Sequence, residues 1–148
     1  MKVEKDFADF IKLLNNHKVE YLIVGAYALA LYAEPRNTGD IDIFINRTDE
    51  NVNSILKVLA DFGFEGLGLT KSDFKTENNV IQLGVPPVRI DILTSISGVD
   101  FNDAYKDKYS NKFGNTTADF ISKDHLIKNK KASSRKKDIA DLESLLNS

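Results

Sequence analysis

The chain has 148 residues, of which 42% are hydrophobic and 28% charged, so its length suits one domain that can bury its own core. It has no cysteine and two histidines, which excludes disulfides, thiol catalysis and cysteine-based zinc sites. Without an H-E-x-x-H pattern, a histidine-based zinc site is also disfavoured. The longest apolar run, Tyr27 to Ala33, is too short to cross a bilayer, and the charged N-terminus does not resemble a signal peptide. We therefore expect a single cytoplasmic domain over residues 1–148, with no membrane partner.

The net charge of −2 is unevenly distributed. From Lys123 to Lys137 there are seven basic residues and one acid, so this stretch carries +6 and the rest of the chain carries −8. Such asymmetry indicates a basic surface that meets an anion. A solvated helix face is the alternative interpretation of the same residues.

The first half of the chain alternates predicted helices and strands. Apolar residues at helical spacing predict a helix over about residues 2–16, and the run E-Y-L-I-V predicts a buried strand over 20–24. A segment rich in Ala and Leu predicts a short helix over 26–33, and the turn P-R-N-T-G leads into a strand over 40–46. Thr48 is expected to cap the next helix, whose core face comprises Val52, Ile55, Leu56, Leu59 and Phe62.

The second half begins with a glycine-rich segment, G-F-E-G-L-G-L-T-K-S, over residues 63–72. It lacks the G-K-[ST] of a P-loop, so we predict a flexible hairpin or lid there. Two strands are predicted over 80–85 and 88–93, joined through Pro86-Pro87. Helices are predicted over about 122–132, capped by Ser122, and over about 136–146. The order of elements predicts an α/β or α+β fold in which helices pack on a mixed sheet. The last helix is expected to bury one face formed by Ile139, Leu142, Leu145 and Leu146.

Three carboxylates lie on predicted strands. Asp40 and Asp42 share one face of the strand D-I-D-I-F-I-N, with Cα atoms about 6.6 Å apart, while Ile41 and Ile43 face the core. Asp91 has the same setting in V-R-I-D-I-L. If the two strands pair, the three carboxylates converge, and oxygen-only ligands select a hard ion, Mg²⁺ or Mn²⁺. Such a set suits two-ion phosphoryl transfer, with ions about 3.5–4 Å apart.

Gly25 stands between a predicted strand and a predicted helix. A glycine at this position lets backbone N–H groups approach a phosphate, and the helix N-terminus favours the negative charge. Gly25 precedes Asp40 by fifteen residues, which leaves room for one short helix and a turn. We therefore expect a phosphate cradle beside the metal site.

These motifs together resemble the DNA polymerase β-type nucleotidyltransferase superfamily. The resemblance is closest to its small stand-alone members, which include minimal nucleotidyltransferases, relatives of abortive-infection toxins and drug-modifying nucleotidyltransferases. P-R-N-T-G-D-I-D-I resembles their R-x-T-x-D-h-D segment, and K-N-K-K-A-S-S-R-K-K-D-I-A-D resembles a K-x-x-x-x-R-x-K-D-x-x-D tail. The resemblance covers about residues 19–146. Family members usually have Gly-Gly or Gly-Ser where this chain has Gly25-Ala26, so a hydroxyl contact to phosphate is lost.

The resemblance implies a polymerase β-like fold and a metal-dependent enzyme. Such an enzyme binds an NTP such as ATP with Mg²⁺ and transfers NMP to an acceptor, releasing pyrophosphate. Asp40 and Asp42 would hold both ions, while Asp91 would hold the catalytic ion and orient or deprotonate the acceptor hydroxyl. Gly25 and the N–H of Ala26 would cradle the outer phosphates. Further nucleotide contacts are expected from the turn residues Arg36 and Thr38, which could instead meet the acceptor, and from the basic residues Lys130, Arg135 and Lys137.

Two questions stay open at this point. The acceptor could be tRNA, another nucleic acid, a protein or a small molecule, and the preferred base is not specified by the motifs. A non-catalytic nucleotide- or RNA-binding protein on the same fold, such as a toxin–antitoxin component with a partner protein, is the main alternative, and Ala26 favours it.

Three other classes fit the chain poorly. A basic-tailed nucleic-acid binder without a nucleotide site is disfavoured, since carboxylates repel a phosphate backbone in the absence of metal. No G-x-S-x-G surrounds Ser95 or Ser97, which disfavours a serine hydrolase. The lack of G-x-G-x-x-G disfavours a Rossmann domain.

Overall fold

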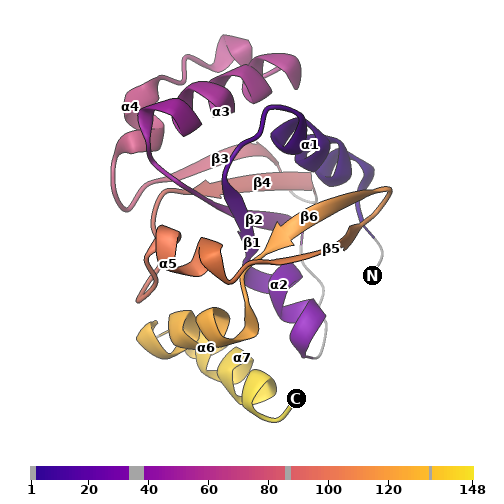
Figure 1. Cartoon of the computed structure of the whole chain (residues 1–148), viewed down its shortest axis with the longest axis vertical. Coiled ribbons are helices and arrows are strands. Elements are labelled where there is room, and N and C mark those ends of the chain that lie inside the picture. Colours follow the sequence, from indigo (N-terminus) through magenta and orange to yellow (C-terminus); the bar gives the residue numbers. More distant parts are fainter. Residues whose placement is uncertain (1–2, 34–38, 86–87, 134) are drawn as a thin grey trace.

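The computed structural model describes residues 3–33, 39–85, 88–133 and 135–148, and its centre is a six-stranded mixed sheet (Figure 1). The strand order is β3-β4-β2-β1-β6-β5. β1 is antiparallel to β2, whereas β2 and β4, and β1 and β6, are parallel. The strands are β1 (Tyr21–Val24), β2 (Asp40–Ile45), β3 (Val80–Val85), β4 (Val88–Leu93), β5 (Tyr109–Phe113) and β6 (Thr116–Phe120).

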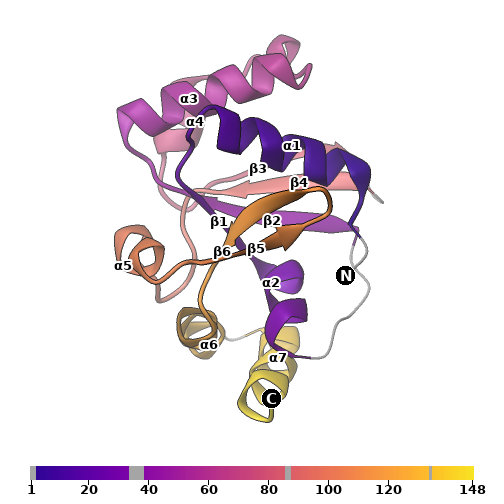
Figure 2. The same cartoon turned by 45° about the vertical axis from the view of Figure 1, so that its right-hand side comes forward.

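Helices cover both faces of this sheet (Figure 2). One layer contains α1 (Lys5–Asn16), α3 (Asp49–Asp61) and α4 (Lys71–Lys75). The opposite side carries α2 (Gly25–Tyr32), α5 (Phe101–Lys106), α6 (Lys123–Ala132) and α7 (Lys136–Leu146). Within the described residues, no helix is long and apolar enough to cross a membrane. The predicted fold class, helices packed on a mixed sheet, is therefore confirmed.

The main core lies between the sheet and the layer formed by α1 and α3. Ile41 and Ile43 on β2 are almost fully buried there, as the two-residue period of a strand predicts. α1 contributes Phe10, whose ring packs edge-on against Phe62 with centroids 5.2 Å apart. Thr48 caps α3 as predicted, because its Oγ1 accepts a hydrogen bond from the backbone N–H of Asn51. One face of β2 is therefore buried in the core, and the opposite face is available for the site.

The prediction of a hairpin over residues 63–72 is wrong, while a role of this segment as a lid stays a prediction. A short 3-10 helix, η1 (Glu65–Leu67), is followed directly by α4. A capping box begins α4, in which the side chains of Thr70 and Asp73 exchange hydrogen bonds with each other's backbone N–H groups. Phe74 then anchors the helix in the core. The local cap and one buried ring outweigh the glycines that precede them.

The predicted buried face of the last helix is only partly right. Leu145 is fully buried, but Ile139 and Leu146 are 52% and 58% exposed. Asp138 and Asp141 are buried on the helix instead. Their burial has an electrostatic cause, since both carboxylates pair with Lys130.

Candidate active site

The three predicted carboxylates meet on the face of the sheet opposite the main core. β2 and β4 are parallel neighbours, and their register places Asp42 directly beside Asp91. One carboxylate oxygen of each of Asp40, Asp42 and Asp91 lies within 4.8 Å of the other two. The expected pairing of the two acidic strands is therefore present. Three oxygen donors at this spacing are a set that could hold a hard metal ion.

Arg89 lies among these acids and was not singled out by the sequence motifs. Its Nε and one terminal nitrogen donate to the two carboxylate oxygens of Asp91, at 2.9 and 3.0 Å. The same terminal nitrogen donates to Asp40 Oδ2 at 3.0 Å. The signal was available in R-I-D, because residues two apart on a strand share a face. A guanidinium here offsets part of the repulsion between two carboxylates.

Burial and mutual repulsion shift the titration of the acidic groups. Burial, followed by the nearby charges of Asp40 and Asp91, raises the pKa of Asp42 to about 6. The pKa of Asp91 is also raised, chiefly by burial, although its bonds to Arg89 act in the opposite direction. Among the described residues, none donates a hydrogen bond to the carboxylate of Asp42. These groups are costly to ionise together, and a bound cation would lower that cost.

Gly25 makes room for one of the acids. It is the first residue of α2 and has a φ of +66°, and a Cβ atom built on it would collide with Asp42 Oδ2. The glycine is therefore required by the carboxylate as well as by the backbone. Val24, the N-cap residue of α2, has no side-chain oxygen. The first N–H groups of α2 therefore donate no hydrogen bond to the N-cap side chain. These N–H groups suit a phosphate.

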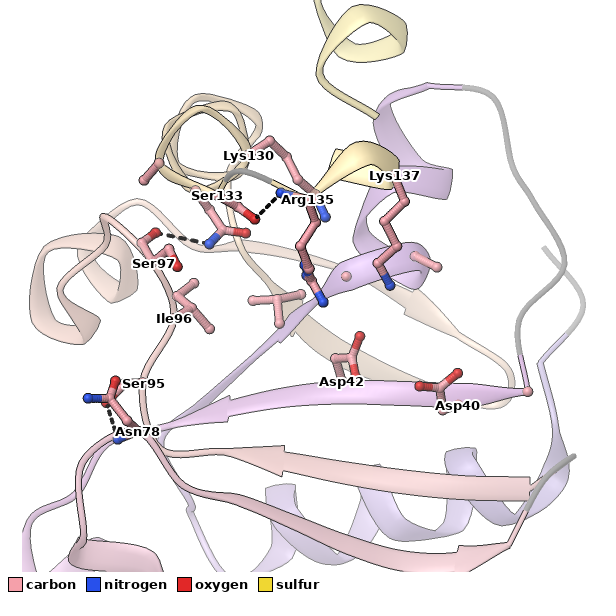
Figure 3. Close-up of a pocket in the computed structure, with 16 residues that line it drawn as sticks. Asp40, Asp42, Asn78, Ser95, Ile96, Ser97, Lys130, Ser133, Arg135 and Lys137 are labelled. Carbon is pink, nitrogen blue, oxygen red and sulfur yellow. Dashed lines mark hydrogen bonds between the residues drawn. The ribbon is translucent and has the colours of Figure 1, made fainter. Parts of the chain in front are cut away.

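A cleft of about 760 Å³ lies over the acidic strand (Figure 3). Asp40 and Asp42 project into it from β2, while Arg135 and Lys137 reach toward them from the opposite side. Gly25 and Ala26 also line it. The remaining lining residues are Val24, Gly39, Asn78, Ser95, Ile96, Ser97, Asn129, Lys130, Ala132 and Ser133.

The basic stretch from Lys123 to Lys137, called the basic tail, has residues in two settings. Some of them are buried in ion pairs, and others face the cleft. Lys130 is only 4% exposed, and its Nζ lies 2.9 Å from Asp138 Oδ1 and 3.3 Å from Asp141 Oδ2. Burial alone would raise the pKa of Asp138, but hydrogen bonds from Ser133, Lys130 and Arg135 outweigh it and hold the pKa well below the usual range. This cluster joins α6 to α7 and explains why two aspartates, rather than leucines, are buried on α7.

Two cations of the tail remain directed at the cleft. Arg135 uses its Nε to contact Asp138 at 2.7 Å, and its side chain is 67% exposed. The side chain of Lys137 points toward Asp42 (Figure 3). Its charge, with that of Lys130, partly counteracts the raised pKa of Asp42. The predicted turn residues Arg36 and Thr38 lie outside the described residues.

Comparison with known proteins gives a consistent result. A family model described as "Nucleotidyltransferase of unknown function (DUF6036)" matches residues 3–146. No curated protein matches the chain. Among solved structures, the chain is similar to a candidate nucleotidyltransferase (TM1012) from Thermotoga maritima, with a TM-score of 0.64 and 16% identity over 99% of this chain and 96% of that one. It is also similar to the lincosamide antibiotic adenylyltransferase LnuA in its lincomycin-bound form, with a TM-score of 0.54 and 14% identity over 99% and 98% of the two chains. The nucleotidyltransferase fold implied by the resemblance is thereby confirmed.

Proposed function

Because this chain belongs to the nucleotidyltransferase family DUF6036, we propose that its acidic cleft transfers NMP from an NTP to an acceptor hydroxyl and releases pyrophosphate. The observation that carries the proposal is the convergence of three carboxylates within 4.8 Å, two of which, Asp40 and Asp42, line the cleft opposite two cations. Carboxylates alone would repel a triphosphate. Cations alone could bind one, but a site of that kind would have no use for three carboxylates. Their combination suits a metal-bound polyphosphate.

We propose that Asp40 and Asp42 bind Mg²⁺ or Mn²⁺, with Asp91 as a further ligand. The donor set fits such an ion, since it consists of oxygens alone and Asp42 is a partly buried carboxylate without a hydrogen-bond donor among the described residues. When bound, the ion supplies positive charge to the phosphates and to the reacting oxygens.

The residues of the chain have separate proposed tasks in the transfer. N–H groups of Gly25 and Ala26, with Arg135 and Lys137, bind and orient the outer phosphates. The acceptor oxygen attacks the α-phosphorus, the bond from that phosphorus to the bridging oxygen breaks, and pyrophosphate leaves. The hydroxyl proton passes to the carboxylate of Asp91, which lies directly beside Asp42 on the neighbouring strand β4.

Lys130 has a different proposed role from the other tail cations. The sequence predicts that it contacts phosphate, and it does line the cleft. Its Nζ is, however, held by Asp138 and Asp141. We propose that Lys130 mainly supports the turn that carries Arg135. The phosphate or acceptor contacts of Arg36 and Thr38 stay predictions from the sequence.

A label-transfer experiment tests the proposed function. Wild-type protein is incubated with Mg²⁺, each α-³²P-labelled NTP and candidate acceptors: small molecules first, since LnuA is named for an antibiotic, then tRNA and protein. We expect labelled acceptor with wild type and none with Asp91→Asn, while NTP binding is retained. Asp103→Asn, an exposed acid on α5, is the matched control and should transfer normally.

Other outcomes separate the alternatives. Near-normal turnover by Asp91→Asn would disprove the three-carboxylate mechanism. NTP binding by wild type without transfer to any acceptor would favour the non-catalytic nucleotide-binding alternative.

A further inference from the structure

The two ends of the cleft differ in chemistry. Arg135, Lys137 and the N-terminus of α2 line one end, where they offer positive charge and N–H groups. The other end has no charged side chain among its described lining residues: Figure 3 shows Asn78, Ser95, Ile96 and Ser97 there. Asn129, which also lines the cleft, joins this end through its hydrogen bond to Ser97. If the proposed function holds, the triphosphate is attracted to the charged end, and the uncharged nucleoside then extends toward the neutral end.

The wall of the neutral end is closely packed on α6. Gly98 has a φ of +71°, and a Cβ atom built on it would lie 2.5 Å from the Cβ of Ala132. A β-bridge between Ile96 and Val99 closes the turn around this glycine. The segment that carries Ser97 is therefore held directly against the helix that carries Asn129. Such packing gives the fixed geometry that selective recognition needs.

The orientation of the Asn129 amide follows from its partner. Asn129 Nδ2 donates to the backbone carbonyl of Ser97 at 2.9 Å. A carbonyl oxygen only accepts hydrogen bonds, so the amide nitrogen must face the turn and Oδ1 remains available as an acceptor. Among the described residues, none donates to this oxygen. Asn129 lines the cleft beside Ser97, so the neutral end contains an oxygen that can only accept hydrogen bonds.

We propose that the neutral end binds the base of the NTP and that Asn129 Oδ1 accepts a hydrogen bond from the 6-amino group of adenine or the 4-amino group of cytosine, which makes the enzyme selective for ATP and CTP. This inference rests on the proposed function, since it assigns the base within the same site. At that ring position guanine and uracil carry a carbonyl oxygen, and the amino group of guanine lies on C2 instead. A carbonyl opposite Oδ1 would place two acceptors face to face and leave both unpaired. Ile96 offers an apolar surface beside the base.

Binding of the four NTPs in the presence of Mg²⁺ tests the inference by isothermal titration calorimetry. For wild type we expect ATP and CTP to bind about three- to tenfold more tightly than GTP and UTP, the range for one neutral hydrogen bond. Asn129→Leu should bind all four with similar affinity. Asn129→Asp keeps an acceptor oxygen and should keep the preference for the two amino bases, even if every affinity falls.

Asn53→Leu is the matched control, because it makes the same substitution at an exposed position of α3, on the other side of the sheet. It should leave the affinities for all four NTPs, and hence the ratio between them, unchanged. The inference is overturned if wild type binds the four equally or prefers purines, or if Asn129→Leu preserves the wild-type ratio as Asn53→Leu does. Failure of wild type to bind any NTP would instead overturn the proposed function. Thermal unfolding shows whether each variant is folded. Where a variant is not folded, the ratio of the four NTP affinities of wild type decides alone.

Discussion

Alanine at Gly25 tests how closely the start of α2 is matched to Asp42. The left-handed φ costs a non-glycine residue about 1–2 kcal/mol, and the added Cβ also displaces the carboxylate. Gly63→Ala is the control, since Gly63 also has a positive φ but no atom lies within 4 Å of its would-be Cβ. We expect both variants to lose stability in urea unfolding, and only Gly25→Ala to lose stabilisation by Mn²⁺. Equal Mn²⁺ stabilisation of the two variants would disprove the coupling.

Substitution of Asp42 by asparagine should change how the free energy of unfolding depends on pH. Because the pKa of Asp42 is raised to about 6, the folded protein holds the proton more tightly than the unfolded chain does, so stability falls as pH rises from about 4 to about 6. Asp42→Asn cannot ionise, and without metal it should match wild type near pH 4 and exceed it by about 3 kcal/mol above pH 7. Urea unfolding in EDTA from pH 4 to pH 8 measures this. A constant difference at every pH would contradict the assignment.

At the level of single residues, the sequence predicts which side chains share a surface better than it predicts their partners. The two-residue period placed Asp40 and Asp42 together correctly, because that rule is local. Arg89 obeys the same rule, but its bridge to Asp40 depends on the pairing of two distant strands. The steric need for Gly25 likewise depends on the antiparallel register of β1 and β2.

Between elements, the α6–α7 connection depends on a buried ion cluster, which Lys130→Met should break. The change leaves Asp138 and Asp141 buried without their shared cation, and removal of one partner of a buried pair costs about 3–5 kcal/mol. Lys128→Met, on an exposed position of the same helix, should change stability by less than about 0.5 kcal/mol. Denaturant unfolding compares the two. If Lys130→Met kept full stability and lost only NTP affinity, Lys130 would be a phosphate ligand, as the sequence predicts.

Elements with strong local signals were predicted well. β3 and β4 have the predicted bounds, and α6 and α7 begin within a residue of theirs. α5, β5 and β6 were not predicted, since β5 is largely polar and exposed on its edge of the sheet. Gly114-Asn115 at the tip of the β5–β6 hairpin was the available signal, with Gly114 at a φ of +60°. The polar buried face of α7 could not follow from hydrophobic spacing, because tertiary pairing determines it.

For the molecule as a whole, a divalent cation should act as a stabilising ligand. Mg²⁺ or Mn²⁺ should raise the melting temperature of wild type, with a gain in stability of about 2.7 kcal/mol at a hundredfold excess over Kd. Asp40→Asn/Asp42→Asn should gain much less, because it lacks the two acids proposed to bind the ion. Differential scanning calorimetry with and without metal measures both. Equal gains by both proteins would remove the metal site from the cleft.

The parallel pairing of β2 with β4 is the feature that no local pattern specified. These strands are separated in the chain by α3, α4 and β3, yet they are neighbours in the sheet. Each strand alone shows only an alternation of acid and isoleucine, which a solvated edge strand also shows. The active-site prediction therefore depended on the combined motifs of the resemblance, and the fold supplies the neighbour relation that makes three scattered acids one group.

The position of α6 and α7 at one end of the molecule makes the protein an electric dipole (Figure 1). Residues 123–148 contain seven basic and four acidic residues, so this pole carries +3 while the rest of the chain carries −5. A polyanion approaching from a distance is oriented toward the positive pole before it makes any contact, which speeds encounter in dilute salt. Stopped-flow association of ATP should therefore slow as ionic strength rises from about 20 to 200 mM, over which the screening length shortens to below about 10 Å. The dissociation rate, which depends on short-range contacts, should change much less.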